Sequence, residues 1–381
     1  MENGNPQASP SGVPPDERLT SLDILRGVAL FGVMAVNLVS EFRVSIFRQF
    51  LPIERPLPPL DGGVEAFVSL ALEMKAFALF SLLFGVGLAM QFDRLSRSGR
   101  PLYWLARRLG VLLLLGLAHL LLIWNGDILA EYAVAGFLVL PFLYAPAWLL
   151  AAAFAGLLAF YAAMPLLQLP IPWPAAATLQ QHVAEANQIY ASGGLGEIWH
   201  FSLRELPYLL LLHIYIFPRT VALFFLGAFL WRIGLLRDLD RHKRALAAGA
   251  LVGIIAGAVL TAGTGAAARL ATVVLALGYG AAVLLLVQRP LAGRVLGAFA
   301  PLGRMAFTNY VLQSLIFGFI FFGYGLGQFG RMGAAQALAL GLVVYAAQML
   351  LSAWWLGRFR YGPLEWLWRT LMYGRAQPMR R

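Results

Sequence analysis

The stretch LLLLGLAHLLLIWNGDIL, residues 112–129, decides the fold class. It lies within an apolar window at 105–125, and a bilayer core requires about 20 mostly apolar residues per helix. Between Leu112 and Gly126 the only ionisable side chain is His119. The stretch therefore predicts a membrane-spanning helix, followed by a tight turn at 124–128 and by the start of the next apolar helix.

Windows of the same kind recur along the whole chain. They lie at about 22–42, 64–91, 105–125, 127–143, 147–167, 206–233, 245–263, 268–287, 304–325 and 333–356. The composition agrees, because 60% of the 381 residues are hydrophobic and 12% are charged, whereas soluble domains have about 45–50% and about 25%. The sequence predicts an all-α polytopic membrane bundle of about ten helices.

Three regions are expected. Residues 1–18 are rich in Pro, Gly, Ser and Asn, which predicts a disordered tail. Residues 19–375 form one transmembrane domain, and residues 376–381 form a basic tail. The longest connection, about 168–205, mixes polar and apolar residues and is expected to lie on the membrane surface. Pro207 and Pro218 are expected to start and kink the helix 206–233.

Basic residues are divided unevenly between alternate loops, and the more basic loops of a membrane protein face the cytoplasm. The basic set is Arg94, Arg97, Arg100, Arg107, Arg108, Arg237, Arg241, Lys243, Arg244, Arg289, Arg294 and Arg304, together with the arginines of the C-terminal tail. Ten crossings then place both termini in the cytoplasm and the 168–205 connection outside. Topology explains the net charge of +11, and no basic stripe indicates nucleic-acid binding.

Several chemistries are excluded or find no support. The chain has no cysteine, which excludes disulfides, thiolate metal sites and a cysteine nucleophile. The five histidines fall in different segments, so no metal site is expected. Neither GxSxG nor a Walker motif is present, so a soluble-type hydrolase or an ATP-driven pump has little support.

Polar side chains gather toward both faces of the predicted bundle. Such groups are costly within a bilayer and often mark a functional site. The outer half contains Asn37, Glu73, Lys75, His119, Asp127, Glu131, His213 and Arg219. The inner half contains Asp23, Arg26, Arg304, Asn309, Gln313 and Gln348. This layout suits a protein that passes an ion, a solute or a chemical group between the two sides.

His119 is the most informative of these residues. As a general base, its neutral imidazole takes a proton near neutral pH. Asp127, eight residues later across the turn, would orient the imidazole and stabilise its protonated form. The alternatives are that His119 hydrogen-bonds a neighbouring helix and that Asp127 caps the next helix. The two roles of Asp127 are compatible.

The remaining candidates also have structural alternatives. Asp23 and Arg26 are three residues apart, so they either balance charge at a helix start or form an anion site for phosphates. Glu73 and Lys75 cannot face each other on a helix, and Arg219 is a candidate ion-pair partner for Glu73. Asn37 is either catalytic or an interhelical hydrogen-bonding group.

A family resemblance adds to this interpretation. SLDILRGVALFGVMAVNL (21–38) resembles the first-helix signature LDxxRGxAxxxxxxxN of bacterial YeiB-like membrane proteins. FSLLFGVG (80–87), HLLLIWNGDILAEYAVAG (119–136), FFLGAFLWRIGLL (224–236), GRMAFTNYVLQSLI (303–316) and RFRYGPLEWLWRTLMYGR (358–375) also match. That family resembles a branch of the transmembrane acyltransferase superfamily, which includes heparan-α-glucosaminide N-acetyltransferase.

The resemblance implies transfer of an acyl group from cytosolic acyl-CoA to a hydroxyl or amine on the far side of the membrane. By the motif, Asp23, Arg26 and Asn37 carry over as site residues, and Arg26 or Arg304 would bind the CoA phosphates. The relatives place a catalytic histidine in the loop after the asparagine, but residues 39–63 contain none. Either His119 has that role, or this branch does different chemistry.

Two other functions remain open at this point. Glu73, Lys75 and Arg219 suit a transporter or exporter of a small solute or lipid, although no repeat is visible. A non-catalytic membrane scaffold or sensor is the third. The expected partners are the lipid bilayer of a bacterial plasma membrane and a small-molecule, glycan or lipid acceptor, with no nucleic acid. A homodimer is compatible with the sequence, which does not fix the oligomeric state.

Overall fold

The computed structural model describes residues 20–52, 57–97, 99–167 and 169–381, and the predicted tail 1–18 lies outside these ranges. The described residues are mostly helical, with an isolated β-bridge between Phe359 and Arg380. The first half contains α1 (Thr20–Asn37), η2 (Leu38–Phe42), η3 (Ile46–Phe50), α2 (Pro59–Phe67), η4 (Val68–Leu72), α3 (Lys75–Ser96), α4 (Pro101–Leu122), α5 (Leu129–Val139), η5 (Leu140–Tyr144), α6 (Ala147–Ala163) and α7 (Ala176–Ser192). The second half contains α8 (Leu195–Arg232), α9 (Lys243–Thr261), α10 (Ala266–Val287), α11 (Pro290–Gly297), α12 (Ala300–Arg304), α13 (Ala306–Phe321), α14 (Ala334–Arg358) and α15 (Pro363–Tyr373).

The predicted all-α polytopic architecture is confirmed. In the described ranges, 7 helical segments are long and apolar enough to span a bilayer, and three shorter apolar segments accompany them. The shorter segments are Leu129–Tyr144, Ala147–Ala163 and Ala306–Phe321. Each predicted window overlaps one of these ten segments, because the length of an apolar run is the strongest feature of a membrane sequence.

Two predicted elements differ in detail. The window 64–91 is not one regular helix, since η4 is a π-helical turn and Met74 adopts a left-handed backbone conformation (φ 63°) before α3 begins. The connection predicted over about 168–205 contains α7, and it ends at Gly194 because α8 begins at Leu195. Pro207 therefore lies inside α8 and does not start it.

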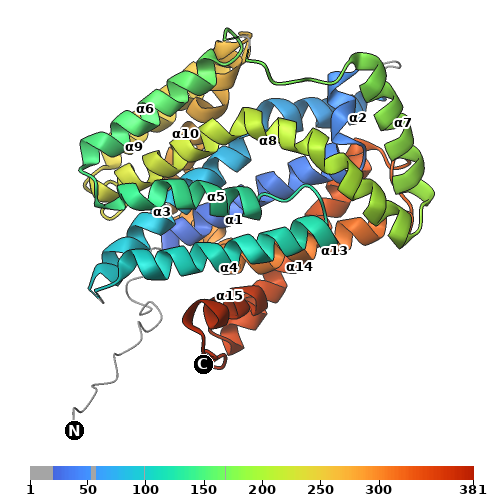
Figure 1. The fold of residues 1–381 in the computed structure, drawn as a ribbon. Coiled ribbons are helices and arrows are strands. Elements are labelled where there is room, and N and C mark those ends of the chain that lie inside the picture. The colour runs from blue at the N-terminus through green and yellow to red at the C-terminus, as the bar shows by residue number, and fades with distance from the viewer. Residues whose placement is uncertain (1–19, 53–56, 98, 168) are drawn as a thin grey trace.

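The centre of the bundle is built on close contact between α3 and α8. A Cβ at Gly85 would lie 2.2 Å from the Phe224 carbonyl oxygen, and one at Gly227 would lie 2.2 Å from the Leu82 carbonyl oxygen. Only glycine allows two helix backbones to approach so closely. In Figure 1, α6, α9 and α10 lie on one side of the bundle, α7 lies on the opposite side, and α15 lies beside α4.

Candidate functional site

Three buried polar side chains form a linear arrangement between α4, the turn after it and α13. His119 Nδ1 lies 2.9 Å from Asp127 Oδ1, and His119 Nε2 lies 3.0 Å from Ser314 Oγ. His119, Asp127 and Ser314 are 2%, 3% and 3% exposed. The predicted contact between His119 and Asp127 is therefore formed, and it is fully shielded from solvent.

Local structure explains how Asp127 reaches the imidazole. α4 ends at Leu122, and the turn that follows brings Asp127 back beside the last turn of that helix. Asp127 Oδ2 also accepts a 2.7 Å hydrogen bond from the backbone N–H of Ala130, in the first turn of α5. One carboxylate thus satisfies a free helix N–H and orients the histidine, so both roles considered from the sequence are present.

The hydrogen bonds fix the imidazole tautomer. A carboxylate only accepts hydrogen bonds, so His119 Nδ1 carries the proton and donates it to Asp127. His119 Nε2 is then unprotonated and accepts from the Ser314 hydroxyl. The order hydroxyl, imidazole, carboxylate is the one that activates serine nucleophiles in unrelated hydrolase folds.

A cavity of about 310 Å³, here called the large cavity, extends from the ends of several helices toward this cluster. Along α3 its wall runs from Arg94 to Phe77, which is about 25 Å at 1.5 Å per residue. One end is lined by Asp23, Arg26, Arg94, Arg108, Arg304, Glu365 and Arg369. The rest is mainly apolar, with Leu30, Val33, Phe77, Phe80, Ile128 and Tyr310 in the wall.

The polar end, here called the mouth, is rich in guanidinium groups. Of its two acidic residues, Asp23 pairs with Arg26 at 2.8 Å, as the sequence predicted. Glu365 accepts hydrogen bonds from the N–H groups of Phe307 and Thr308 at 2.9 and 3.1 Å, so it caps the start of α13. Burial raises the pKa of Glu365, and these hydrogen bonds partly offset the shift. The mouth therefore offers a net positive site for an anion.

α12 brings Arg304 to this mouth by packing directly on α1. A Cβ at Gly303 would lie 1.9 Å from the Asp23 carbonyl oxygen, so the two backbones are in contact. Arg108 lies over the Trp368 ring, 4.2 Å from its centroid, and the Trp368 indole N–H donates to the Arg108 carbonyl. α15 is thereby held against α4 at the mouth. The three predicted residues Asp23, Arg26 and Arg304 are brought together here.

A second cavity, here called the small cavity, lies beside the turn that precedes Asp127. Its volume of about 20 Å³ is enough for one water molecule. Its walls include Glu41, Trp124, Asn125, Gly126, Tyr190 and Glu205. Glu205 accepts from His182, Asn125 and Tyr190 at 2.8, 2.8 and 2.7 Å. Burial and the Glu205 carboxylate raise the pKa of Tyr190 well above its usual range.

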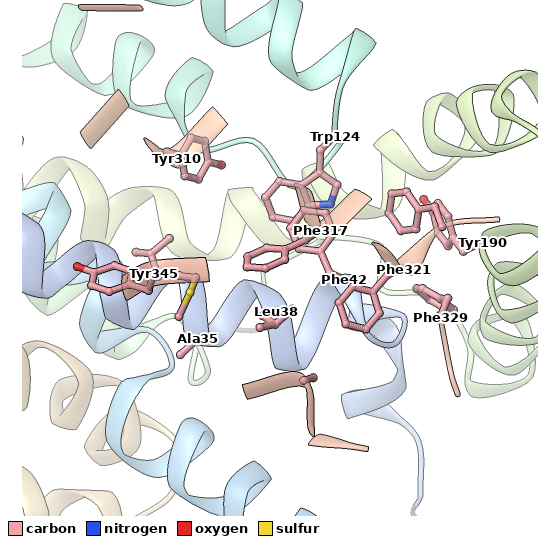
Figure 2. Close-up of a cluster of buried hydrophobic side chains, with 14 of the residues drawn as sticks. Ala35, Leu38, Phe42, Trp124, Tyr190, Tyr310, Phe317, Phe321, Phe329 and Tyr345 are labelled. Atoms are coloured by element: carbon pink, nitrogen blue, oxygen red, sulfur yellow. The ribbon is translucent and has the colours of Figure 1, made fainter. Parts of the chain in front are cut away.

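His119, Asp127 and Ser314 line neither cavity themselves, but residues next to them line both. Gly126 lines the small cavity and Ile128 lines the large one, with Asp127 between them in the chain. In Figure 2, Trp124 and Phe317 lie between Tyr310 of the large cavity and Tyr190 of the small cavity. The sequence placed a polar site at each face and counted His119 and Asp127 in the outer one. None of the residues expected in that outer site lines the small cavity, whereas Asp23, Arg26 and Arg304 of the inner site line the large one.

Other candidates lie away from both cavities and bond to one another. Gln313 Nε2 donates to Gln348 Oε1 at 2.8 Å, and Asn309 Nδ2 donates to Ser352 Oγ at 2.9 Å. Gln348 Nε2 completes the chain by donating to the Asn309 carbonyl oxygen at 3.1 Å. These amides join α13 to α14, so Asn309 and Gln313 have an interhelical role, and the ligand binding expected of them stays a prediction.

The predicted ion pair between Glu73 and Arg219 is not formed. Arg219 is 1% exposed and donates to the Met74 carbonyl oxygen at 3.4 Å, and Lys75 Nζ donates to the Ser69 carbonyl oxygen at 3.1 Å. The break at Met74 separates Glu73 from regular helix, which explains the difference. A different carboxylate, Glu131 on α5, contacts α8: it pairs with His213 and accepts a hydrogen bond from Thr220.

Asn37 is not one of the residues that contact one another in the His119 cluster. It is 5% exposed at the end of α1, and its Oδ1 has no hydrogen-bond partner among the described residues. An unsatisfied buried amide oxygen is costly. Asn37 thus remains a candidate for binding a polar group, although it lines neither cavity.

Sequence reasoning missed Ser314 and the Glu205 network. Ser314 stands within GRMAFTNYVLQSLI, one helical turn after Tyr310, but its partner His119 is 195 positions away. His182 and Glu205 were placed in the external connection, where they had no visible relation to each other. Only the helical continuation of α8 back to Leu195 brings Glu205 to His182.

The chain is similar to several bacterial proteins and matches a family model. Residues 230–375 match the family described as Protein of unknown function (DUF418). The chain is 33% identical to Uncharacterized protein YxaH of Bacillus subtilis (strain 168), with 96% of each chain covered. It is 30% identical to Uncharacterized protein YeiB of Escherichia coli (strain K12), with 95% of this chain and 98% of that one covered. A 39.9 kDa protein of Bacillus acidopullulyticus is 29% identical, with 96% of each covered.

Proposed function

The chain belongs to the DUF418 family of YeiB-like proteins, and we propose that it is an acyltransferase of the bacterial plasma membrane. It would move an acyl group from cytosolic acyl-CoA to a hydroxyl or amine acceptor on the opposite side. The observation that carries the proposal is the position of His119. Its imidazole contacts the Asp127 carboxylate and lies beside Tyr310 of the cavity with the cationic mouth, and the turn that carries Asp127 lines the second, polar cavity.

Each part of the large cavity matches a part of the donor. Guanidinium groups such as Arg26 and Arg304 suit phosphates, because their planar fork donates paired hydrogen bonds to oxyanions. The apolar wall beyond them suits an extended thiol arm and its acyl group. Its inner end at Tyr310 lies next to the imidazole, since the Tyr310 and His119 ring centroids are 5.2 Å apart.

His119 would act as the general base. Its Nε2 faces a hydroxyl at hydrogen-bond distance and is free of a proton, as deprotonation of a nucleophile requires. Asp127 would stabilise the imidazolium that forms. No part of this scheme uses a metal ion. The acceptor would approach from the side of the small cavity, which would have to widen to admit it and whose walls carry carboxylate, amide and phenol groups.

The test is donor turnover by the purified protein in nanodiscs, measured for a series of acyl-CoA thioesters with water-soluble and lipid acceptors. Replacing His119 by Gln retains hydrogen-bonding groups but removes the base, so transfer is expected to fall by about 10²–10⁴-fold. The matched control is His200→Gln, which alters an exposed histidine on α8 that lines neither cavity.

Two results would overturn the proposal. The first is absence of donor binding and turnover across the whole thioester series. The second is flux of a solute or lipid across liposomes without any covalent product. That result would favour a transporter, a function that two cavities with aromatic side chains between them also suit. Full activity of the His119→Gln variant would instead remove His119 as the base.

A further inference from the structure

Ser314 has a second hydrogen-bond partner besides the one that is ordinary for a serine inside a helix. Such a hydroxyl ordinarily donates to the carbonyl oxygen one turn earlier in its own helix. Here the Tyr310 carbonyl oxygen lies 3.3 Å from Ser314 Oγ, whereas His119 Nε2 lies closer, at 3.0 Å. The Ser314 hydroxyl can donate to either atom, and with the Nδ1–H tautomer His119 Nε2 is the nearer acceptor and can take the hydroxyl proton.

The location of Ser314 is as informative as its geometry. It stands one turn beyond Tyr310, which lines the large cavity, and its partner His119 is held by Asp127, whose neighbours Gly126 and Ile128 line the two different cavities. At 3% exposure Ser314 is shielded from bulk water, so an ester formed there would be protected from hydrolysis. Ser314 itself lines neither cavity, and Tyr310, one helical turn earlier, is the nearest wall residue on its helix that a group attached to Oγ would meet.

We propose that Ser314 is the nucleophile of a covalent acyl-enzyme, which carries the acyl group from one cavity to the other. This inference rests on the proposed acyl-transfer function. In the first step Ser314 Oγ bonds to the thioester carbonyl carbon and the carbon–sulfur bond breaks. His119 takes the hydroxyl proton and gives it to the departing thiolate, so CoA leaves as the thiol.

The second step returns the enzyme to its starting state. The hydroxyl or amine of the acceptor attacks the Ser314 ester, and the bond between the acyl carbon and Oγ breaks. His119 takes the proton of the acceptor and returns it to Ser314 Oγ. No oxidant, reductant or further reactant is consumed, and both steps use the same imidazole, held in one tautomer by Asp127.

The experiment is rapid-quench mass spectrometry of the full chain in nanodiscs with an acyl-CoA thioester and no acceptor, together with steady-state transfer when the acceptor is present. An acyl adduct is expected on the peptide that contains Ser314, and Ser314→Ala is expected to lose the adduct and at least about a thousandfold in transfer. Ser314→Cys is expected to restore an adduct, as a hydroxylamine-sensitive thioester. The matched control is Ser352→Ala, a buried serine that accepts only from Asn309 and should leave the adduct unchanged.

Distinct results separate this inference from the function on which it rests. Donor turnover with no adduct on Ser314, or with the acyl group on His119, leaves acyl transfer standing and overturns the nucleophile. Ser314→Ala activity within about tenfold of the unaltered protein does the same, because that is the scale of one lost neutral hydrogen bond. Absence of turnover in the unaltered protein overturns the acyl-transfer function and this inference together.

Discussion

The Asp127 carboxylate accepts hydrogen bonds from two N–H groups, one of His119 and one of Ala130. A substitution that keeps the second bond and changes the first therefore tests the role of Asp127 toward the imidazole. Asn in its place keeps one acceptor for the Ala130 N–H, but its amide donates toward His119 Nδ1 and thereby favours the other imidazole tautomer. Nε2 then carries a proton and no longer accepts from Ser314. Transfer by Asp127→Asn is expected to fall by about 10³–10⁴-fold, measured as kcat with the thioester donor. Thermal stability close to that of the unaltered protein is the control, and kcat within tenfold would contradict a tautomer role for Asp127.

At the scale of single residues, the sequence was informative only over short distances. The contacts between His119 and Asp127 and between Asp23 and Arg26 were predictable, because one turn or one helix face joins each pair. The contact between Ser314 and His119 was not predictable, because helix packing and not closeness in the chain brings α13 beside α4. The pairing of Glu73 with Arg219 was predicted wrongly, because nothing in the residue types around Met74 indicates that its backbone is left-handed.

At the scale of elements, Gly87 on α3 leaves open space at the wall of the large cavity. It lies in the wall between Phe84 and Met90, and a Cβ there would meet nothing within 4 Å. Leu at this position is therefore expected to fold normally and to fill the passage. Binding of long acyl-CoA thioesters, measured by calorimetry in nanodiscs, should weaken by at least about tenfold, given about 0.8 kcal/mol per buried methylene.

The control for Gly87→Leu is Gly156→Leu on α6, an exposed position outside the cavity where a Cβ also meets nothing within 4 Å. The control should bind every thioester as the unaltered protein does. Equal binding of long thioesters by Gly87→Leu would show that the chain takes a different path. A parallel loss in both variants would point to a general effect of leucine on the bundle.

α15 offers an element-scale prediction that depends on pH. Burial raises the pKa of Glu365 above 4.5 in the folded protein. An acid with a raised folded pKa loses stability as pH rises from its unfolded value to its folded one, because the unfolded chain ionises first. Melting of the purified protein is expected to show this decline, and Glu365→Gln, which still accepts the N–H groups of α13, is expected to lack it. Identical pH profiles for the two proteins would exclude Glu365 as the cause.

At the scale of the whole molecule, the apolar windows predicted the architecture well because span length depends on the bilayer and not on packing. The ends of α1, α3, α4, α12 and α15 that meet at the large cavity all belong to segments that the arginine pattern places on the cytoplasmic side. α7 and the start of α8 belong to the opposite side. Packing in the described residues and the charge pattern thus agree on which helix ends lie together.

The absence of cysteine makes the orientation directly testable. Single cysteines at the exposed positions Ala376, after α15, and Asn187, on α7, give two variants without background labelling. In intact cells a membrane-impermeant maleimide is expected to label Asn187→Cys and to leave Ala376→Cys unlabelled until the membrane is opened. The reverse pattern would place the cationic mouth outside, where cytosolic acyl-CoA cannot reach it, and would overturn the direction of transfer. Labelling of both in intact cells would mean that the ten-helix topology itself is wrong, because in that topology five crossings, an odd number, separate α7 from each terminus.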